Sequence, residues 1–253
     1  MSDAYDLDEG PDPATLAAAS PEPIDWEGES PVHAVGIGPG NVAFLTPRGR
    51  RAIREADVVV GFETVVEFVR GETDADLLTC GYRDEGETLA TFAERVADGE
   101  RGTAVLMGDP NHSGYQFVGK VQRAVDSQVR VVPGISSLQV AASRARTPME
   151  DTEFVTLHKS GDIGPDLERV RRQVGERHLL VLPRPFDWMP EDIAAALVDD
   201  GASPNLGTLV LERLTHDDEA ITRTTLGELA GTADRTPADE SRFSDLSVLA
   251  VRR

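Results

Sequence analysis

The sequence contains very little cysteine and no long hydrophobic run. Its single cysteine, Cys80, excludes an internal disulfide, which suits a reducing cytoplasm. We expect Cys80 to be a small packed residue rather than a nucleophile. No stretch approaches the roughly 20 apolar residues of a transmembrane helix, and the acidic N-terminus does not resemble a secretory signal. The sequence therefore predicts a cytoplasmic protein without a membrane span.

Lysine is also scarce, since Lys120 and Lys159 stand against 23 arginines. Acidic residues number 45, and the formal net charge is -20. This charge disfavours nucleic acid and anionic membranes as partners, because both attract positive charge. An acid-rich, lysine-poor surface is typical of proteins that stay soluble in high salt, where ions screen the repulsion between carboxylates. A GC-rich genome also replaces lysine by arginine, so halophilic adaptation is a hypothesis.

The chain divides into three regions. Residues 1–30 combine prolines and acidic residues with few large apolar ones, which predicts a disordered acidic tail. Strand and helix patterns alternate over residues 31–148, and this order predicts a mostly parallel sheet with helices on its faces. Over residues 149–253 several strands follow one another with few helices, which indicates a mixed or antiparallel sheet. The predicted fold class is therefore two α/β domains.

Hydrophobic periodicity, caps and turn residues locate the individual elements. We predict strands at residues 32–37, 57–61, 103–108, 129–134, 153–158, 178–183, 206–214, 219–226 and 244–253. We predict helices at residues 46–56, 63–71, 88–99, 115–125, 136–146 and 190–201. Thr46 is expected to cap the first helix with Pro47 in its first turn, and Glu87 or Thr88 to cap the third. Most arginines, such as Arg169 and Arg171, are expected on solvated helix faces.

The loop "GIGPGN" follows the first predicted strand and is the first candidate site. A dinucleotide fingerprint would have glycine where Asn41 stands, and Pro39 lacks an N–H that a phosphate cradle would use. A nicotinamide oxidoreductase is therefore disfavoured. The loop suits either a flat ligand that approaches the backbone closely or a simple tight turn.

Two further loops follow predicted strands. In "MGDP", Asp109 is held in a stiff turn and could accept hydrogen bonds from a ligand, although Asp-Pro is also a common turn. In "PGISS", Ser136 or Ser137 can cap the following helix. Loops at the carboxyl ends of strands in one sheet lie along one edge. The three loops together therefore predict a cleft.

The motifs "VGIGPGN", "GDP" at 108–110 and "PGISS" at 133–137, in this order, resemble those of the tetrapyrrole (corrin/porphyrin) methylase family. The resemblance runs from about Val32 to the C-terminus. It implies a two-domain α/β enzyme with its active-site cleft between the domains and S-adenosylmethionine as cofactor. The stretches "EADVVVG", "VVPGISSLQVAASR", "EFVTLHKSGD" and "FSDLSVLAVRR" are most similar to members that methylate C5 of cobalt-precorrin-7 in anaerobic-type cobalamin biosynthesis.

The resemblance also assigns residues and partners. It places Gly38 and Pro39 beside the macrocycle substrate. The implied cofactor-binding residues are Pro39, Gly40, Met107, Gly108, Asp109, Ser136, Ser137, Leu182 and Leu211. Asp109 would be the main polar contact, and the segments around Leu182 and Leu211 would hold the adenine. A homodimer is expected, as is a separate decarboxylating methyltransferase in the same pathway, because the chain carries no second module.

Two histidines are candidate bases for the proton lost after C-methylation. His112 lies in the second loop and His158 ends a strand of the second domain, and each could instead be an ordinary polar loop residue. No group of residues has metal-ligand spacing, so we expect no protein-bound metal and place any cobalt in the substrate. Two alternatives remain: a methylase of this fold with another carbon or substrate, and a catalytically silent cofactor-binding or corrinoid-binding homologue.

Overall fold

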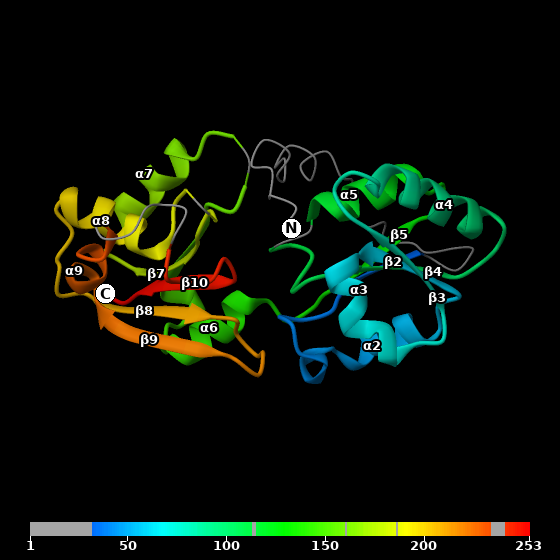
Figure 1. Cartoon of the computed structure of the whole chain (residues 1–253), viewed down its shortest axis with the longest axis horizontal. Coiled ribbons are helices and arrows are strands. Elements are labelled where there is room, and N and C mark those ends of the chain that lie inside the picture. The colour runs from blue at the N-terminus through cyan, green and yellow to red at the C-terminus, as the bar shows by residue number, and fades with distance from the viewer. Residues whose placement is uncertain (1–31, 113–114, 160, 186, 234–240) are drawn as a thin grey trace. The chain divides into compact units, whose positions relative to one another are not determined.

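The computed structural model describes residues 32–112, 115–159, 161–185, 187–233 and 241–253. The predicted acidic tail, residues 1–30, lies outside the described residues. The described chain forms two compact units, one ending at Ser136 and the other spanning Ser137–Arg253 (Figure 1). Among these residues, no helix is both long and apolar enough to cross a membrane.

The first unit is built on a five-stranded sheet in which all strands are parallel. Its strands are β1 (Val32–Gly36), β2 (Val58–Phe62), β3 (Asp76–Cys80), β4 (Gly102–Leu106) and β5 (Val129–Val132). Their spatial order is β3-β2-β4-β1-β5. The central strands β1, β2 and β4 are almost entirely buried, as expected for strands with helices on both faces. The predicted parallel sheet is confirmed.

Helices cover both faces of this sheet. They are α2 (Pro47–Arg54), α3 (Glu63–Val69), α4 (Glu85–Ala97) and α5 (Tyr115–Ala124). Ile53 of α2 and Val66 of α3 pack into the core on one face. Phe92 of α4 and Val121 of α5 pack into the core on the other. The alternation of side chains along each strand thus supplies two separate cores.

A side-chain cap marks the start of α2, and an ion pair lies at the start of α4. Thr46 Oγ1 accepts a hydrogen bond from Gly49 N at 3.1 Å, which confirms the predicted cap of α2. The prediction that α4 begins at Glu87 or Thr88 is wrong, because the helix begins at Glu85. Glu85 is buried and forms an ion pair with Lys120 of α5, so a contact from another helix extends the first turn.

The second unit contains a mixed sheet. Its strands are β6 (Thr152–Thr156), β7 (His178–Leu182), β8 (Gly207–Glu212), β9 (Ala220–Thr225) and β10 (Ser247–Val251). Their spatial order is β6-β7-β10-β8-β9. Strands β6 and β7 are parallel, and the other neighbouring pairs are antiparallel. The predicted mixed sheet is confirmed.

Among the described residues of the second unit, four helices pack on this sheet. They are α6 (Ser137–Ala145), α7 (Gly164–Gln173), α8 (Pro190–Asp199) and α9 (Leu226–Ala230). Helices α7, α8 and α9 bury Val170, Ile193 and Leu226 in one core. Helix α6 packs against β7 and β10, and Figure 1 shows it on the opposite face. Arg169 and Arg171 lie on α7 as predicted, where they pair with Glu153 and Glu168.

Strand β3 and helices α7 and α9 have no counterpart among the ranges predicted from the sequence. Strand β3 is an edge strand that pairs with β2 alone, and most of its residues are partly exposed. Cys80 ends this strand, is 2% exposed and lies with its Sγ 3.5 Å from Gly61 O. Burial raises the pKa of the Cys80 thiol to about 12. Cys80 is thus the packed residue that the sequence predicts.

Candidate functional site

The ends of β4, β1 and β5 lie side by side, because these strands are neighbours in the parallel sheet. The loops that follow them, residues 37–41, 107–112 and 133–136, form what we call the three-loop edge. Gly38 N donates to Gly108 O at 3.2 Å, and Gly108 N donates to Gly38 O at 2.8 Å. These reciprocal bonds join the first two loops beyond the end of the sheet. The prediction that the three loops share one edge is confirmed.

Glycines are required where these loops touch one another. A Cβ atom on Gly134 would lie 2.2 Å from Gly108 O and 2.7 Å from the carbonyl carbon of Gly36. A Cβ atom on Gly36 would lie 2.6 Å from Gly108 O. Any side chain at these positions would overlap backbone atoms. The absence of side chains therefore serves contact between loops, in addition to any contact with a ligand.

The first loop itself is buried and has an unusual backbone. Gly38 and Gly40 have φ angles of +93° and +122°, which favour glycine, and Pro39 between them is buried. Asn41 Oδ1 accepts from Ala43 N at 2.9 Å and caps the 3-10 helix η1 (Val42–Phe44). Helix α2 begins only at Pro47, so its N-terminus does not follow the glycines directly. A dinucleotide fold would place a helix N-terminus there.

The carboxylate of Asp109 links the second loop to the third. Its Oδ1 accepts from Asn111 N at 2.9 Å and from Asn111 Nδ2 at 3.1 Å. Its Oδ2 accepts from Gly134 N at 3.0 Å. Asp109 is 6% exposed. Both oxygens of the residue predicted as the main polar cofactor contact are thus engaged within the protein.

The other predicted residues of the first unit lie on or next to the same edge. Met107 is partly buried against the core that α2 and α3 cover. His112 N donates to Asp109 O at 3.0 Å, and its Nδ1 lies 3.6 Å from Asp109 Oδ1. Ser136 is 3% exposed and ends the third loop, and Ser137 is the first residue of α6.

In the second unit, His158, Leu182 and Leu211 lie toward one edge of the mixed sheet. Leu182 ends β7, and its carbonyl oxygen accepts from Leu157 N at 2.8 Å. Leu211 is fully buried one residue before the end of β8, which runs in the same direction as β7. Burial lowers the pKa of His158, and the charge of Asp245 opposes this shift. A neutral imidazole at pH 7 is able to accept a proton.

The loop after β8 belongs to this edge, and the sequence prediction missed it. Arg213 and Thr215 have φ angles of +43° and +73°, a conformation that non-glycine residues adopt infrequently and often at functional sites. Thr215 N donates to Glu219 Oε2 at 2.8 Å. Glycine or asparagine would have signalled this backbone, and neither occurs here. The loop is an additional candidate for ligand contact.

Known proteins match the part of the chain that contains the candidate site. The model of the family described as Tetrapyrrole (Corrin/Porphyrin) Methylases matches residues 31–230. A probable cobalt-precorrin-7 C(5)-methyltransferase of Methanocaldococcus jannaschii is 28% identical over 199 residues, which are 79% of this chain and 91% of the relative.

Two solved structures show the same fold. The X-ray structure of a cobalt precorrin-4 methyltransferase matches with a TM-score of 0.68 and 20% identity, over 87% of this chain and 94% of that one. A uroporphyrin-III C-methyl transferase from Thermus thermophilus, solved with S-adenyl homocysteine, matches with a TM-score of 0.63 and 21% identity, over 88% and 92% of the two chains.

The close contact between loops predicts the effect of one added methyl group. Gly134→Ala should lower the free energy of unfolding by about 2 kcal/mol or more, because overpacking against backbone atoms forces the loops apart. Gly86→Ala is the matched control, since Gly86 lies in the first turn of α4 and a Cβ there meets nothing within 4 Å. It should stabilise the protein by about 0.5–1 kcal/mol. Urea unfolding measures both, and equal stabilities of the two variants would contradict the described packing.

Proposed function

Because the chain belongs to the tetrapyrrole (corrin/porphyrin) methylase family, we propose that it methylates C5 of cobalt-precorrin-7 in anaerobic-type cobalamin biosynthesis. Family membership makes it an S-adenosylmethionine-dependent tetrapyrrole C-methyltransferase. The choice of substrate and carbon rests on the M. jannaschii relative, which the chain matches over 91% of that protein's length. This shared length is the observation that supports the finer proposal.

A second candidate function is methylation of another ring carbon or another tetrapyrrole. A cobalt precorrin-4 methyltransferase shares the fold with a TM-score of 0.68, so the fold is compatible with this candidate. A shared fold does not select a carbon, since substrate specificity depends on individual side chains in the site. A homologue that binds the ligands without turnover is the remaining alternative.

The three-loop edge fits S-adenosylmethionine, which supplies an electrophilic methyl group on a sulfonium when it is bound. Pro39, Gly40 and Met107 offer backbone and apolar atoms, which suit a sulfonium group because it has no N–H or O–H donor. N–H donors on the same edge hold the Asp109 carboxylate in place, so an acidic group lies on the edge that would hold the sulfonium. We retain the proposal that backbone near Leu182 and Leu211 holds the adenine, and we add the loop of Arg213 and Thr215 to that segment.

The work of the protein in this reaction is mainly to position the two ligands. Orientation of two reactants can contribute up to about 7–11 kcal/mol to lowering a barrier. The hydrogen bonds that join the loops fix the backbone before a ligand arrives, which reduces the ordering cost of binding. We propose that His112 or His158 accepts the proton released after C-methylation. The electron-rich carbon of the substrate is itself the nucleophile that attacks the methyl group.

Further parts of the proposal concern the protein's surroundings. We propose a cytoplasmic homodimer that acts alongside a separate decarboxylating methyltransferase. The proposal places cobalt in the substrate rather than on the protein. Over the ranges that the structure describes, no group of three His, Cys, Asp or Glu side chains is arranged to hold a metal ion.

Methyl transfer tests the central proposal. Incubation with methyl-labelled S-adenosylmethionine and cobalt-precorrin-7 should place one label at C5, as located by NMR of the product. His112→Gln and His158→Gln should separate the two candidate bases, because loss of a general base slows turnover by about 10²–10⁴-fold while cofactor affinity is retained. Label at another carbon would support the second candidate. Calorimetry that showed NAD binding and no S-adenosylmethionine binding would end the proposal.

We also propose adaptation to high salt, given the net charge of -20. The Debye length falls from about 10 Å at 0.1 M salt to about 3 Å at 1 M, so repulsion between surface carboxylates weakens. The urea midpoint should therefore rise between 0.1 M and 2 M KCl. A midpoint that is unchanged or lower in 2 M KCl would count against salt adaptation.

A further inference from the structure

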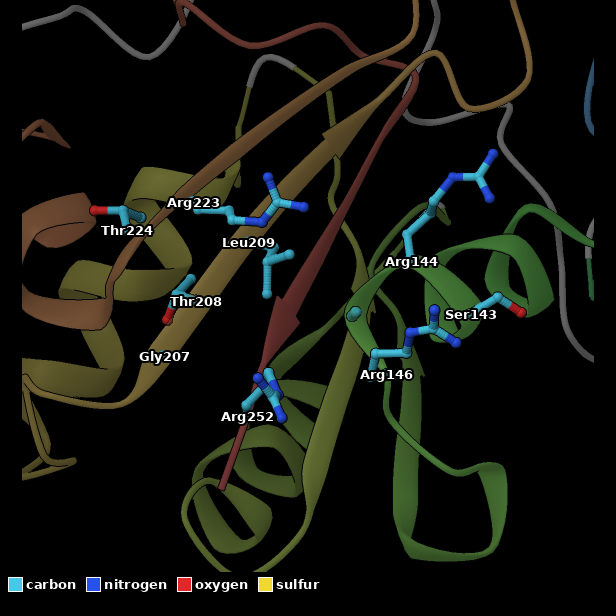
Figure 2. A pocket seen from close by; sticks show the side chains of 10 residues that line it. Ser143, Arg144, Arg146, Gly207, Thr208, Leu209, Arg223, Thr224 and Arg252 are labelled. Carbon is cyan, nitrogen blue, oxygen red and sulfur yellow. The ribbon is translucent and has the colours of Figure 1, made fainter.

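We propose that the second unit carries a binding site for a small multivalent oxyanion, formed by Arg144, Arg146, Arg223 and Arg252. These arginines line a hollow of about 570 Å³, which we call the arginine hollow. Figure 2 shows them approaching from two sides, with Arg223 and Arg252 on the sheet and Arg144 and Arg146 near the end of α6. The proposal does not depend on the methyl-transfer reaction.

The arginine hollow is defined by the ends of several elements. Arg223 lies opposite Leu209 in the register of β8 and β9, and Arg252 directly follows β10. Arg252 N donates to Gly207 O at 2.8 Å, which fixes the backbone of that arginine at the start of β8. The remaining residues of the lining are small or uncharged, so the lining contains no carboxylate.

Three of the four arginines have no carboxylate partner among the residues that the structure describes. Arg144 pairs with Glu219 at 2.9 Å, whereas Arg146, Arg223 and Arg252 form no ion pair. The three arginines thus add positive charge without a carboxylate partner in a chain with 45 acidic and 25 basic residues. Elsewhere in this unit, arginines such as Arg213 and Arg253 do pair with carboxylates. The arginine hollow therefore keeps an excess positive charge in an acidic protein.

A hollow of similar size in the first unit provides a contrast. It has a volume of about 560 Å³ and is lined by Arg50, Arg51, Arg54 and Glu55. Arg50 and Arg54 both pair with Glu72, and Glu55 contributes a carboxylate to the lining itself. The charge of that hollow is thus largely compensated within the protein. A cluster of arginines therefore need not carry an excess positive charge. The arginine hollow does carry one, because three of its arginines have no carboxylate partner among the described residues.

The backbone of Arg146 supports a role beyond packing. Arg146 directly follows α6 and has a φ of +56°, in the left-handed region. Glycine or asparagine usually occupies this position after a helix, because a side chain with a Cβ is strained there. Thr147 N donates to Ala142 O at 3.1 Å and completes the turn. An exposed arginine here strains the backbone, and it brings a guanidinium to the hollow.

The arginine hollow is separate from the edge to which we assign the adenine. It lies at the start of β8, whereas Leu182 and Leu211 lie at or near the ends of β7 and β8. The two edges of one sheet face in opposite directions along the strands. An anion in the arginine hollow would therefore bind at the opposite end of β8 from the proposed adenine segment. It would not occupy the adenine site.

The chemistry of the lining indicates the class of ligand. Guanidinium groups bind carboxylates and phosphates through two parallel hydrogen bonds. A volume of about 570 Å³ is within the range of small-molecule sites. The hydroxyls of Thr208 and Thr224 already donate to Leu206 O and Glu228 Oε2, so the arginines are the main available donors. The ligand should carry two or more carboxylate or phosphate groups.

Calorimetry of the full chain with pyrophosphate and with citrate tests the site. Binding of at least one of these anions is expected, and the tighter one identifies phosphate or carboxylate as the natural group. Arg146→Gly should weaken binding about tenfold, because the anion loses the charged hydrogen bonds of one guanidinium group. It should leave the urea midpoint unchanged or higher, because glycine suits the left-handed backbone. The double variant Arg223→Gln, Arg252→Gln should weaken binding further.

Arg172→Gln is the matched control. Arg172 is exposed on α7, has no ion pair among the described residues and lies outside the arginine hollow. Its loss changes the net charge by the same amount as Arg146→Gly and should leave the affinity unchanged. The proposal is overturned if neither anion binds, if Arg146→Gly and the double variant bind as tightly as the unmodified protein, or if Arg172→Gln weakens binding equally.

Discussion

The carboxylate of Asp109 is the contact on which the three-loop edge depends. It accepts backbone hydrogen bonds from Asn111 in its own loop and from Gly134 in the next, and so ties the ends of β4 and β5 together across β1. This link is possible only because Gly36 and Gly134 have no side chains and let the loop backbones meet. Replacement of any of these residues would change the shape of all three loops, because the loops pack directly against one another.

This arrangement connects the fold to the reaction that we propose. Methyl transfer from a sulfonium needs little acid–base chemistry and depends on holding two ligands in line. A loop edge fixed by its own hydrogen bonds is already ordered when the cofactor arrives. The residues of the "GDP" motif thus have a role in the protein's own architecture, whichever ligand atoms they also contact. The sequence pattern of a binding site can record how its loops pack as well as what they bind.

The alternation of strands and helices was enough to predict both sheets, because buried runs such as "VVVG" and "HLLVLP" have few alternatives. It missed β3, whose partly exposed residues pair on one side only, and it began α4 too late because Glu85 is held by Lys120. The motifs located the candidate site. They could not reveal that Asp109 is engaged within the protein, since that depends on the order β4-β1-β5. The arginine hollow was likewise invisible, because its arginines are far apart in the sequence.

The most direct test is to measure the stability and the cofactor affinity of Asp109→Asn, with the exposed Asp126→Asn as control. The amide has the same shape, but its NH2 group faces an N–H donor of Gly134 or the two N–H donors of Asn111. If the carboxylate holds the loops together, the variant loses about 1–3 kcal/mol of unfolding free energy and binds S-adenosylmethionine at least tenfold more weakly. Asp126→Asn should change neither. Full stability of Asp109→Asn in urea, with or without a loss of affinity, would contradict this account.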